Sequence, residues 1–149
     1  LRAGSIVSAF ESSAEGWTIQ DLRSLGPYEP PVGNYTVNWA ASGGREGGYI
    51  QRGDPTSNAF SFAAPAAFLG DRSGFYGGFL RFSLKTTLAD WPSDNVVVLV
   101  GPQSQVLVAA ISPLPGTTWT DYRIPLVEES FRKKTERDKN RHRNNPKLL

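Results

Sequence analysis

The sequence predicts an all-β protein, and three observations support this prediction. Aromatic residues make up 11% of the 149 residues, and 15 Gly and 11 Pro supply turns. Short stretches that alternate between apolar and polar residues recur at intervals of about 8 to 15 residues, the spacing of a β-sandwich. Before residue 127 no convincing helix pattern occurs, and the chain length suits one domain.

The expected elements follow from alternation, apolar runs and turn residues. Prolines make residues 22–33 a surface loop, and four glycines make residues 41–48 a turn. The continuous apolar run at residues 96–100 is typical of a strand buried on both faces. Eight or nine strands are expected, with candidates at residues 6–10, 17–21, 35–39, 49–52, 60–62, 79–87, 96–100, 105–111 and 119–127.

Residues 60–87 are expected to organise the rest of the chain as two packed strands joined by a compact connection. Phe60 and Phe62 alternate with Ser61, and Pro65 ends that strand. In the second strand, Leu80 and Phe82 point to one side and the polar residues to the other. One shared core is predicted to contain Phe60, Phe62, Leu80, Phe82, Val97, Leu99 and Ile124.

Several motifs occur together in a fixed order. They are FESSAEGW, GGYIQRGD, APAAFLGDRSGFYGGFLRFSLKT, VVLVG and WTDYRIPLVE, within residues 6–129. In this order the chain resembles the laminin IV type A domain, also called the laminin B domain. The resemblance implies a β-sandwich of jelly-roll type, similar to carbohydrate-binding modules, in a secreted or cell-surface protein. It also implies an architectural or binding role and no catalysis.

The net charge of +2 conceals two regions of opposite sign. Residues 1–130 carry eight Arg and Lys against twelve Asp and Glu, a net charge of −4, and residues 131–149 carry eight against two, a net charge of +6. We therefore expect a laminin-IV-type-A-like domain at residues 5–129 and a basic tail, disordered or loosely helical, at residues 130–149. The acidic body argues against a nucleic-acid-binding face. The lack of an 18-residue apolar run argues against membrane insertion.

The tail lacks the apolar closing strand that the resemblance implies. Phe131 is followed by sixteen positions with no apolar side chain other than Pro146. Such a stretch cannot supply the inward-facing side chains of a strand. The chain is therefore expected to be a truncated or alternatively ended form. It is also expected to present an unpaired strand edge that could self-associate or accept a partner's strand.

The chemistry of the side chains argues against an enzyme. The chain has no Cys, and its single His, His142, lies in the basic tail, so neither a catalytic triad nor a zinc site is expected. Calcium is a possible structural cofactor. FESSAEGW resembles the opening of carbohydrate-binding jelly rolls in which the acid after the first Phe helps hold the ion. The resemblance places Glu11 in that role, and Asp121 is an acid that could complete the site.

Exposed aromatic rings could stack on sugars, because a flat ring offers apolar area at a low entropic cost. The candidates are Tyr28, Tyr35, Trp39 and Trp91, which lie in loops or near strand ends; Trp119 is a further such residue but is expected, with Trp17, to be in the core. This residue set supports a second function, a carbohydrate-binding module.

Two short motifs suggest surface chemistry. Asn34 begins an Asn-Tyr-Thr sequon, so it is a candidate for N-glycosylation in a secreted protein. Arg52, Gly53 and Asp54 spell an integrin-type triplet. The sequence thus predicts a non-catalytic, extracellular architectural or adhesion module whose partners are matrix proteins or glycans.

Overall fold

The structure is a computed structural model of the 149-residue chain. It describes residues 4–21, 32–53, 55, 60–87, 96–103 and 105–133. The chain divides into two compact units. The first unit combines residues 1–23 and 31–76, and the second combines residues 24–30 and 77–149. The described regular structure consists of antiparallel strands and three single turns of 3₁₀-helix, which confirms the predicted all-β class.

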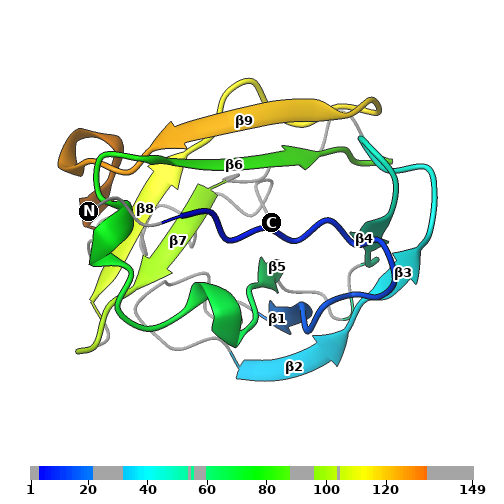
Figure 1. Ribbon diagram of the computed structural model, residues 1–149, viewed down its shortest axis with the longest axis horizontal. Coiled ribbons are helices and arrows are strands. Elements are labelled where there is room, and N and C mark those ends of the chain that lie inside the picture. Colours follow the sequence, from blue (N-terminus) through cyan, green and yellow to red (C-terminus); the bar gives the residue numbers. More distant parts are fainter. Residues whose placement is uncertain are drawn as a thin grey trace, which may run out of the picture. The chain divides into compact units, whose positions relative to one another are not determined.

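The first unit contains a three-stranded and a two-stranded sheet (Figure 1). Strand β1 (Thr18–Asp21) lies between β2 (Val32–Thr36) and β5 (Phe60–Ala63), and β3 (Asn38–Ala40) pairs with β4 (Tyr49–Gln51). Ile19, in the central strand, is fully buried. The short turns η1 (Ala66–Phe68) and η2 (Ser73–Phe75) follow β5. The first of these begins directly after Pro65 and lies in the compact connection that was expected.

The second unit also contains two sheets (Figure 1). Strand β6 (Phe79–Leu84) pairs with β9 (Thr120–Pro125) over six residues, and we call this pair the β6–β9 ribbon. Strand β8 (Val106–Ala110) lies between β7 (Val96–Val100) and the two-residue β10 (Arg132–Lys133). The turn η3 (Glu128–Ser130) connects β9 to β10.

Apolar side chains from both sheets form the core of the second unit. Its buried members are Ala109, Ile111, Tyr122 and Ile124, and Leu80, Phe82, Leu84, Val97 and Phe131 pack against them. The rings of Phe82 and Tyr122 stack with their centroids 5.3 Å apart. Two sheets sharing one core is the arrangement of a β-sandwich, and the jelly-roll topology remains a prediction.

Some predicted strands differ from the observed ones. Residues 6–10 form no strand, and the strand expected at residues 35–39 divides at Val37 into β2 and β3, which pair with different partners. The two strands of residues 60–87 do not pair with each other. Instead β5 pairs with β1, and β6 pairs with β9, because both partners lie far away in the sequence and alternation does not specify a partner.

The predicted core was partly wrong. Leu80, Phe82, Val97 and Ile124 share the core of the second unit, as expected. A core shared with Phe60 and Phe62, which belong to the first unit, stays a prediction. Leu99, in contrast, is 40% exposed. Strand β7 is therefore not buried on both faces. That property belongs to its neighbour β8, whose consecutive residues Val108 and Ala109 are 2% and 3% exposed. A strand with partners on both sides is covered more completely than a strand at the edge of a sheet.

Pairing continues beyond residue 129, where the folded domain was expected to end. Phe131 packs against the core of the second unit, and Arg132 and Lys133 pair with Val108 and Leu107. The first two residues after Phe131 thus add a short strand through backbone hydrogen bonds, which require no apolar side chains. The division between domain and tail stays a prediction, and residues 134–149 lie outside the described residues.

Within the described ranges, no helix is long and apolar enough to span a membrane.

Candidate functional site

The segment after Phe10 is held by polar contacts to its own backbone. Phe10 and Glu15 both have positive φ angles, of 55° and 53°, and the Phe10 N–H donates a hydrogen bond to the Glu15 carboxylate. The carbonyl oxygen of Phe10 accepts a 2.7 Å hydrogen bond from the indole N–H of Trp39. The acid of this motif that bonds to Phe10 is therefore Glu15, and not Glu11, although both residues are exposed.

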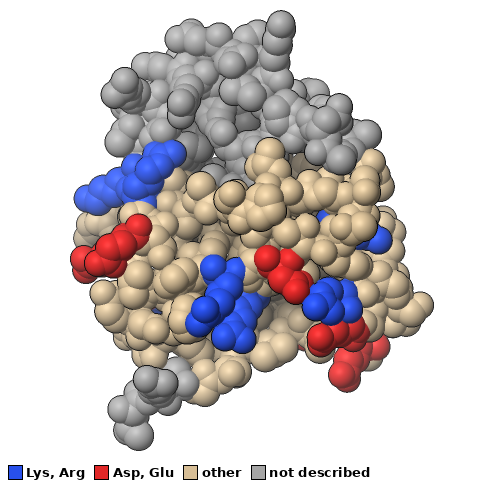
Figure 2. Space-filling view, turned by 90° about the horizontal axis from the view of Figure 1, so that it is seen from above, with Lys and Arg blue, Asp and Glu red and all other residues tan. Residues whose placement is uncertain are grey.

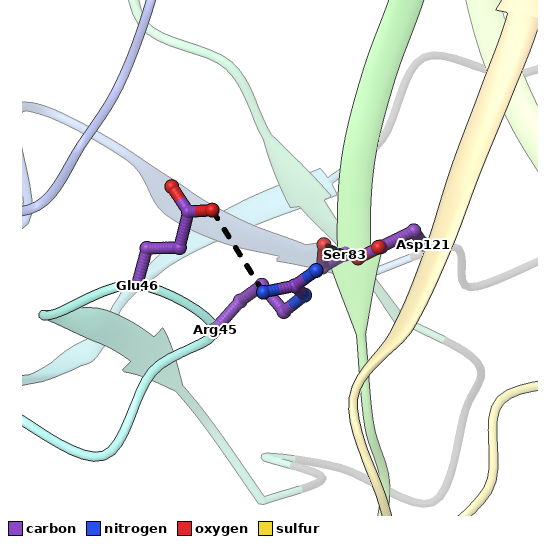
Figure 3. A network of polar contacts seen from close by, with 4 residues as sticks. All are labelled: Arg45, Glu46, Ser83 and Asp121. Atoms are coloured by element: carbon purple, nitrogen blue, oxygen red, sulfur yellow. Dashed lines mark hydrogen bonds and ion pairs between the residues drawn. The ribbon is translucent and has the colours of Figure 1, made fainter.

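The glycine-rich loop between β3 and β4 packs closely against the same carbonyl. A Cβ atom on Gly48 would lie 1.9 Å from the Phe10 oxygen, and one on Gly44 would lie 2.4 Å from the Gly48 oxygen. Both positions therefore exclude any side chain. The loop is the turn that was expected: Gly43 and Gly47 have positive φ angles, and Gly44 and Gly48 allow the close packing of the backbone. Arg45 and Glu46 at its tip form an exposed ion pair at 3.8 Å (Figure 3).

The two residues predicted to bind calcium belong to different units, Glu11 to the first and Asp121 to the second. In the part of the chain that the structure describes, no group of three or more potential ligand side chains gathers as a metal site. Asp121 accepts a 2.6 Å hydrogen bond from the Ser83 hydroxyl (Figure 3). Calcium binding by these acids stays a prediction.

The candidate sugar-binding aromatics occupy different settings. Tyr28 and Trp91 lie outside the described residues. Tyr35 is half-buried on β2 opposite the buried Ile19, and Trp39 is 38% exposed with its N–H directed at Phe10. The described candidates thus present no pair of fully exposed rings on which a sugar could stack.

The two surface motifs of the first unit lie on or near strand β2. Asn34 is exposed within β2, and its Oδ1 accepts a 3.2 Å hydrogen bond from Gln20 Nε2 on β1. Arg52 donates a 2.8 Å hydrogen bond to the Thr36 carbonyl, so its guanidinium is held against its own chain. Asp54 lies outside the described residues. The glycosylation and integrin-type motifs both stay predictions.

The outward face of the β6–β9 ribbon was not singled out from the sequence. Its register places Arg81 of β6 directly opposite Arg123 of β9. Both guanidinium groups lie over the ring of Phe79, with their carbon atoms 5.7 Å and 3.5 Å from its centroid. Phe79 is 42% exposed. The alternation of residues 79–87 placed Arg81 outward correctly, but only the pairing register brings Arg123 beside it.

This face continues toward the other end of the ribbon. The Lys85 ammonium lies 5.2 Å from the centroid of the Trp119 ring, and the Ser83–Asp121 pair lies between that contact and the two arginines. We call the side chains of Phe79, Arg81, Ser83, Lys85, Trp119, Asp121, Arg123 and Pro125 the ribbon face. Lys85 and Trp119 flank the two strands, and Trp119, which was expected in the core, is only half-buried. The ribbon face carries three cations and one carboxylate.

The comparisons with known proteins agree with the ordered motifs. The family described as Laminin B (Domain IV) matches residues 61–145, which is more than half of the chain and extends past residue 129, where the motifs stop. Laminin subunit gamma-1 of Xenopus tropicalis is 32% identical over 131 residues. That match covers 85% of this chain and 8% of the relative. No solved structure matches. Through the family match, the chain belongs to the laminin B (domain IV) family.

Proposed function

We propose that this chain is a non-catalytic architectural and adhesion module of a longer, secreted matrix or cell-surface protein. Membership of the laminin B family supports this proposal, together with the similarity of 85% of the chain to a laminin subunit. Because the match spans 8% of that relative, the module would act as one part of a larger protein.

The chemistry of the described residues supports a role without catalysis. They include no His and no Cys, so they offer neither an imidazole base nor a thiolate nucleophile. The Ser83 hydroxyl donates to Asp121 on the ribbon face, and no described imidazole is available to activate it. The described residues instead present exposed apolar and charged side chains on sheets that the buried cores stabilise, and such a surface is suited to binding.

The proposal is tested by measuring retention on a matrix. The labelled, folded chain is incubated with decellularised matrix from cultured animal cells, and serum albumin serves as the reference protein. We expect saturable retention that an excess of unlabelled chain competes away. Retention no greater than that of albumin would overturn the proposed role.

Glycosylation at Asn34 forms part of this proposal, because a secreted chain would meet the glycosylation machinery. Asn34 is exposed, and the atom that carries a glycan is Nδ2, whereas the hydrogen bond from Gln20 uses Oδ1. A glycan on Asn34 is therefore compatible with that contact.

A matched pair of variants tests the sequon when the chain is secreted from animal cells. Thr36→Ser preserves an acceptor sequon and Thr36→Ala removes it. We expect a glycosidase-sensitive gain in mass for the natural chain and for Thr36→Ser, and no gain for Thr36→Ala. An unglycosylated natural chain would overturn the assignment of Asn34.

A further inference from the structure

The two arginines of the ribbon face are directly opposed cations on a solvent-facing sheet surface. The register pairs Arg81 with Arg123, and both residues are exposed. Like charges in directly opposite positions of an antiparallel pair destabilise a sheet. Their contact with the Phe79 ring offsets part of this repulsion and orients both guanidinium groups on one side of the ribbon.

The hydrogen-bonding capacity of these two groups is not used within the described part of the chain. There, no carboxylate forms an ion pair with Arg81 or Arg123, and no carbonyl oxygen accepts a hydrogen bond from them. Each guanidinium carries five N–H donors in a planar fork that fits an oxyanion with two parallel bonds. The two guanidinium groups, which the Phe79 ring orients, can therefore bind one anion side by side.

The positive charge extends along the ribbon. Lys85 lies four residues after Arg81 and one residue past the end of β6, a distance of about 13 Å for an extended chain. The carboxylate on this face, Asp121, accepts a hydrogen bond from Ser83, so part of its capacity is already used. Figure 2 looks from the side on which β9 and β6 lie in Figure 1 and shows Lys and Arg atoms near the middle of this surface, with Asp and Glu atoms beside them.

We propose that the ribbon face binds a linear sulfated polysaccharide, with Arg81 and Arg123 holding one sulfate group and Lys85 reaching another along the chain. This inference rests on the proposed extracellular function. The oxygens of a sulfate ester suit paired arginine forks, and a polymer with repeated sulfates can reach charges about 13 Å apart.

The geometry favours a polysaccharide over a nucleic acid. Single-stranded nucleic acids are held largely by bases that stack on open aromatic faces. Here the guanidinium of Arg123 covers one face of the Phe79 ring at 3.5 Å, and Lys85 lies over Trp119. The rings thus serve to position cations and leave less room for bases.

The test measures the dissociation constant for heparin, a sulfated polysaccharide, at 150 mM NaCl with the full chain. The double variant Arg81→Ser/Arg123→Ser should raise the dissociation constant at least tenfold. Arg141→Ser/Arg143→Ser, which removes the same charge from the basic tail, should change it less than about twofold. Equal losses in the two variants would overturn the proposal, because binding would then follow net charge alone.

A conservative variant and a set of ligands separate the alternatives. Arg81→Lys/Arg123→Lys keeps both charges but removes the forks, and we expect it to weaken heparin binding at least threefold; unchanged binding would overturn the assignment of two forks. Desulfated heparin should bind at least tenfold more weakly than heparin. Binding of single-stranded DNA as tight as that of heparin would overturn the choice of a polysaccharide.

The same variants distinguish this inference from the proposed function. A chain retained on the matrix without measurable heparin binding would overturn the inference and leave the matrix role standing. Heparin binding that depends on the two arginines, without retention on the matrix, would overturn the proposed matrix role and leave the binding of heparin by the ribbon face standing. Circular dichroism of each variant should match the natural chain, because both side chains are exposed on the sheet surface.

Discussion

The indole Nε1 of Trp39 donates a 2.7 Å hydrogen bond to the carbonyl oxygen of Phe10, which joins two positions 29 residues apart. Phe10 lies in a segment without regular structure, and Trp39 lies in the short strand β3. A backbone carbonyl outside a sheet needs a partner from elsewhere, and here a side chain supplies it. The contact fixes the path of the amino-terminal segment in the first unit.

Replacing Trp39 with Phe should lower the free energy of unfolding by about 1 kcal/mol, because the hydrogen bond to Phe10 is lost while most of the ring is kept. Urea denaturation measures this change. Tyr76→Phe is the control, since Tyr76 is 66% exposed and should change stability by less than about 0.5 kcal/mol. Equal stability of Trp39→Phe and the natural chain would show that the contact contributes nothing in solution.

Replacing Gly48 with Ala should lower the free energy of unfolding by at least about 2 kcal/mol. The new Cβ would lie 1.9 Å from the Phe10 oxygen, so the backbone itself must move. Gly53→Ala is the matched control, because no atom lies within 4 Å of a Cβ built there. Thermal unfolding of both variants decides the point, and a melting temperature of Gly48→Ala equal to that of Gly53→Ala would contradict the close approach.

Replacing Phe82 with Ala should cost about 3 kcal/mol, because the ring packs against the core of the second unit and stacks on Tyr122. Phe79→Ala provides a control of the same residue type on the same strand. Phe79 faces outward and is 42% exposed, so its loss should cost clearly less. A larger effect at Phe79 than at Phe82 would mean that the faces of β6 are assigned the wrong way round.

Stability should fall at alkaline pH through Tyr122. Burial raises the pKa of Tyr122 above its ordinary value, and a hydrogen bond involving Thr120 opposes this in part. The unfolded chain therefore releases the phenol proton first. The stabilisation is fully present below about pH 10 and is lost as pH rises through the folded-state pKa.

The control for this pH dependence is Tyr122→Phe, which removes the titrating group together with the hydrogen bond to the Pro113 carbonyl. This variant should be less stable at neutral pH but lose less stability between pH 9 and 11. Urea unfolding across that pH range measures both effects. Parallel losses in the variant and the natural chain would exclude Tyr122 as the source.

Replacing Phe131 with Ala should lower the free energy of unfolding by about 2 kcal/mol, because its ring packs against the core of the second unit. Leu114→Ala is the comparison, since Leu114 is 52% exposed and its loss should be nearly neutral. A neutral effect at Phe131 would place the end of the folded core before this residue.

Much of the local structure could be predicted from the sequence. Alternation placed Leu80 and Phe82 inward and Arg81 outward, and Pro65 ended β5 where expected. The ordered motifs identified the family that the comparison with known families confirmed. These features depend on neighbours in the chain, which a sequence displays directly.

The failures share one physical cause. Residues 6–10 have the composition of a strand, yet the backbone N–H and C=O of Phe10 bond to the side chains of Glu15 and Trp39. The short β10 forms from Arg and Lys without apolar side chains. Whether a backbone segment becomes a strand depends on whether a partner edge lies beside it. The local sequence pattern does not show which edge will lie beside a given segment.

The sequence by itself determined the β class, the family, the turns and the inward or outward direction of alternating side chains within each strand. Only the tertiary structure decided which strand pairs with which, and hence that Arg81 faces Arg123 and that β8, in place of β7, is covered on both sides. Register links residues that are far apart in the chain, and it is selected by the packing of whole sheets. No single stretch of residues contains that information.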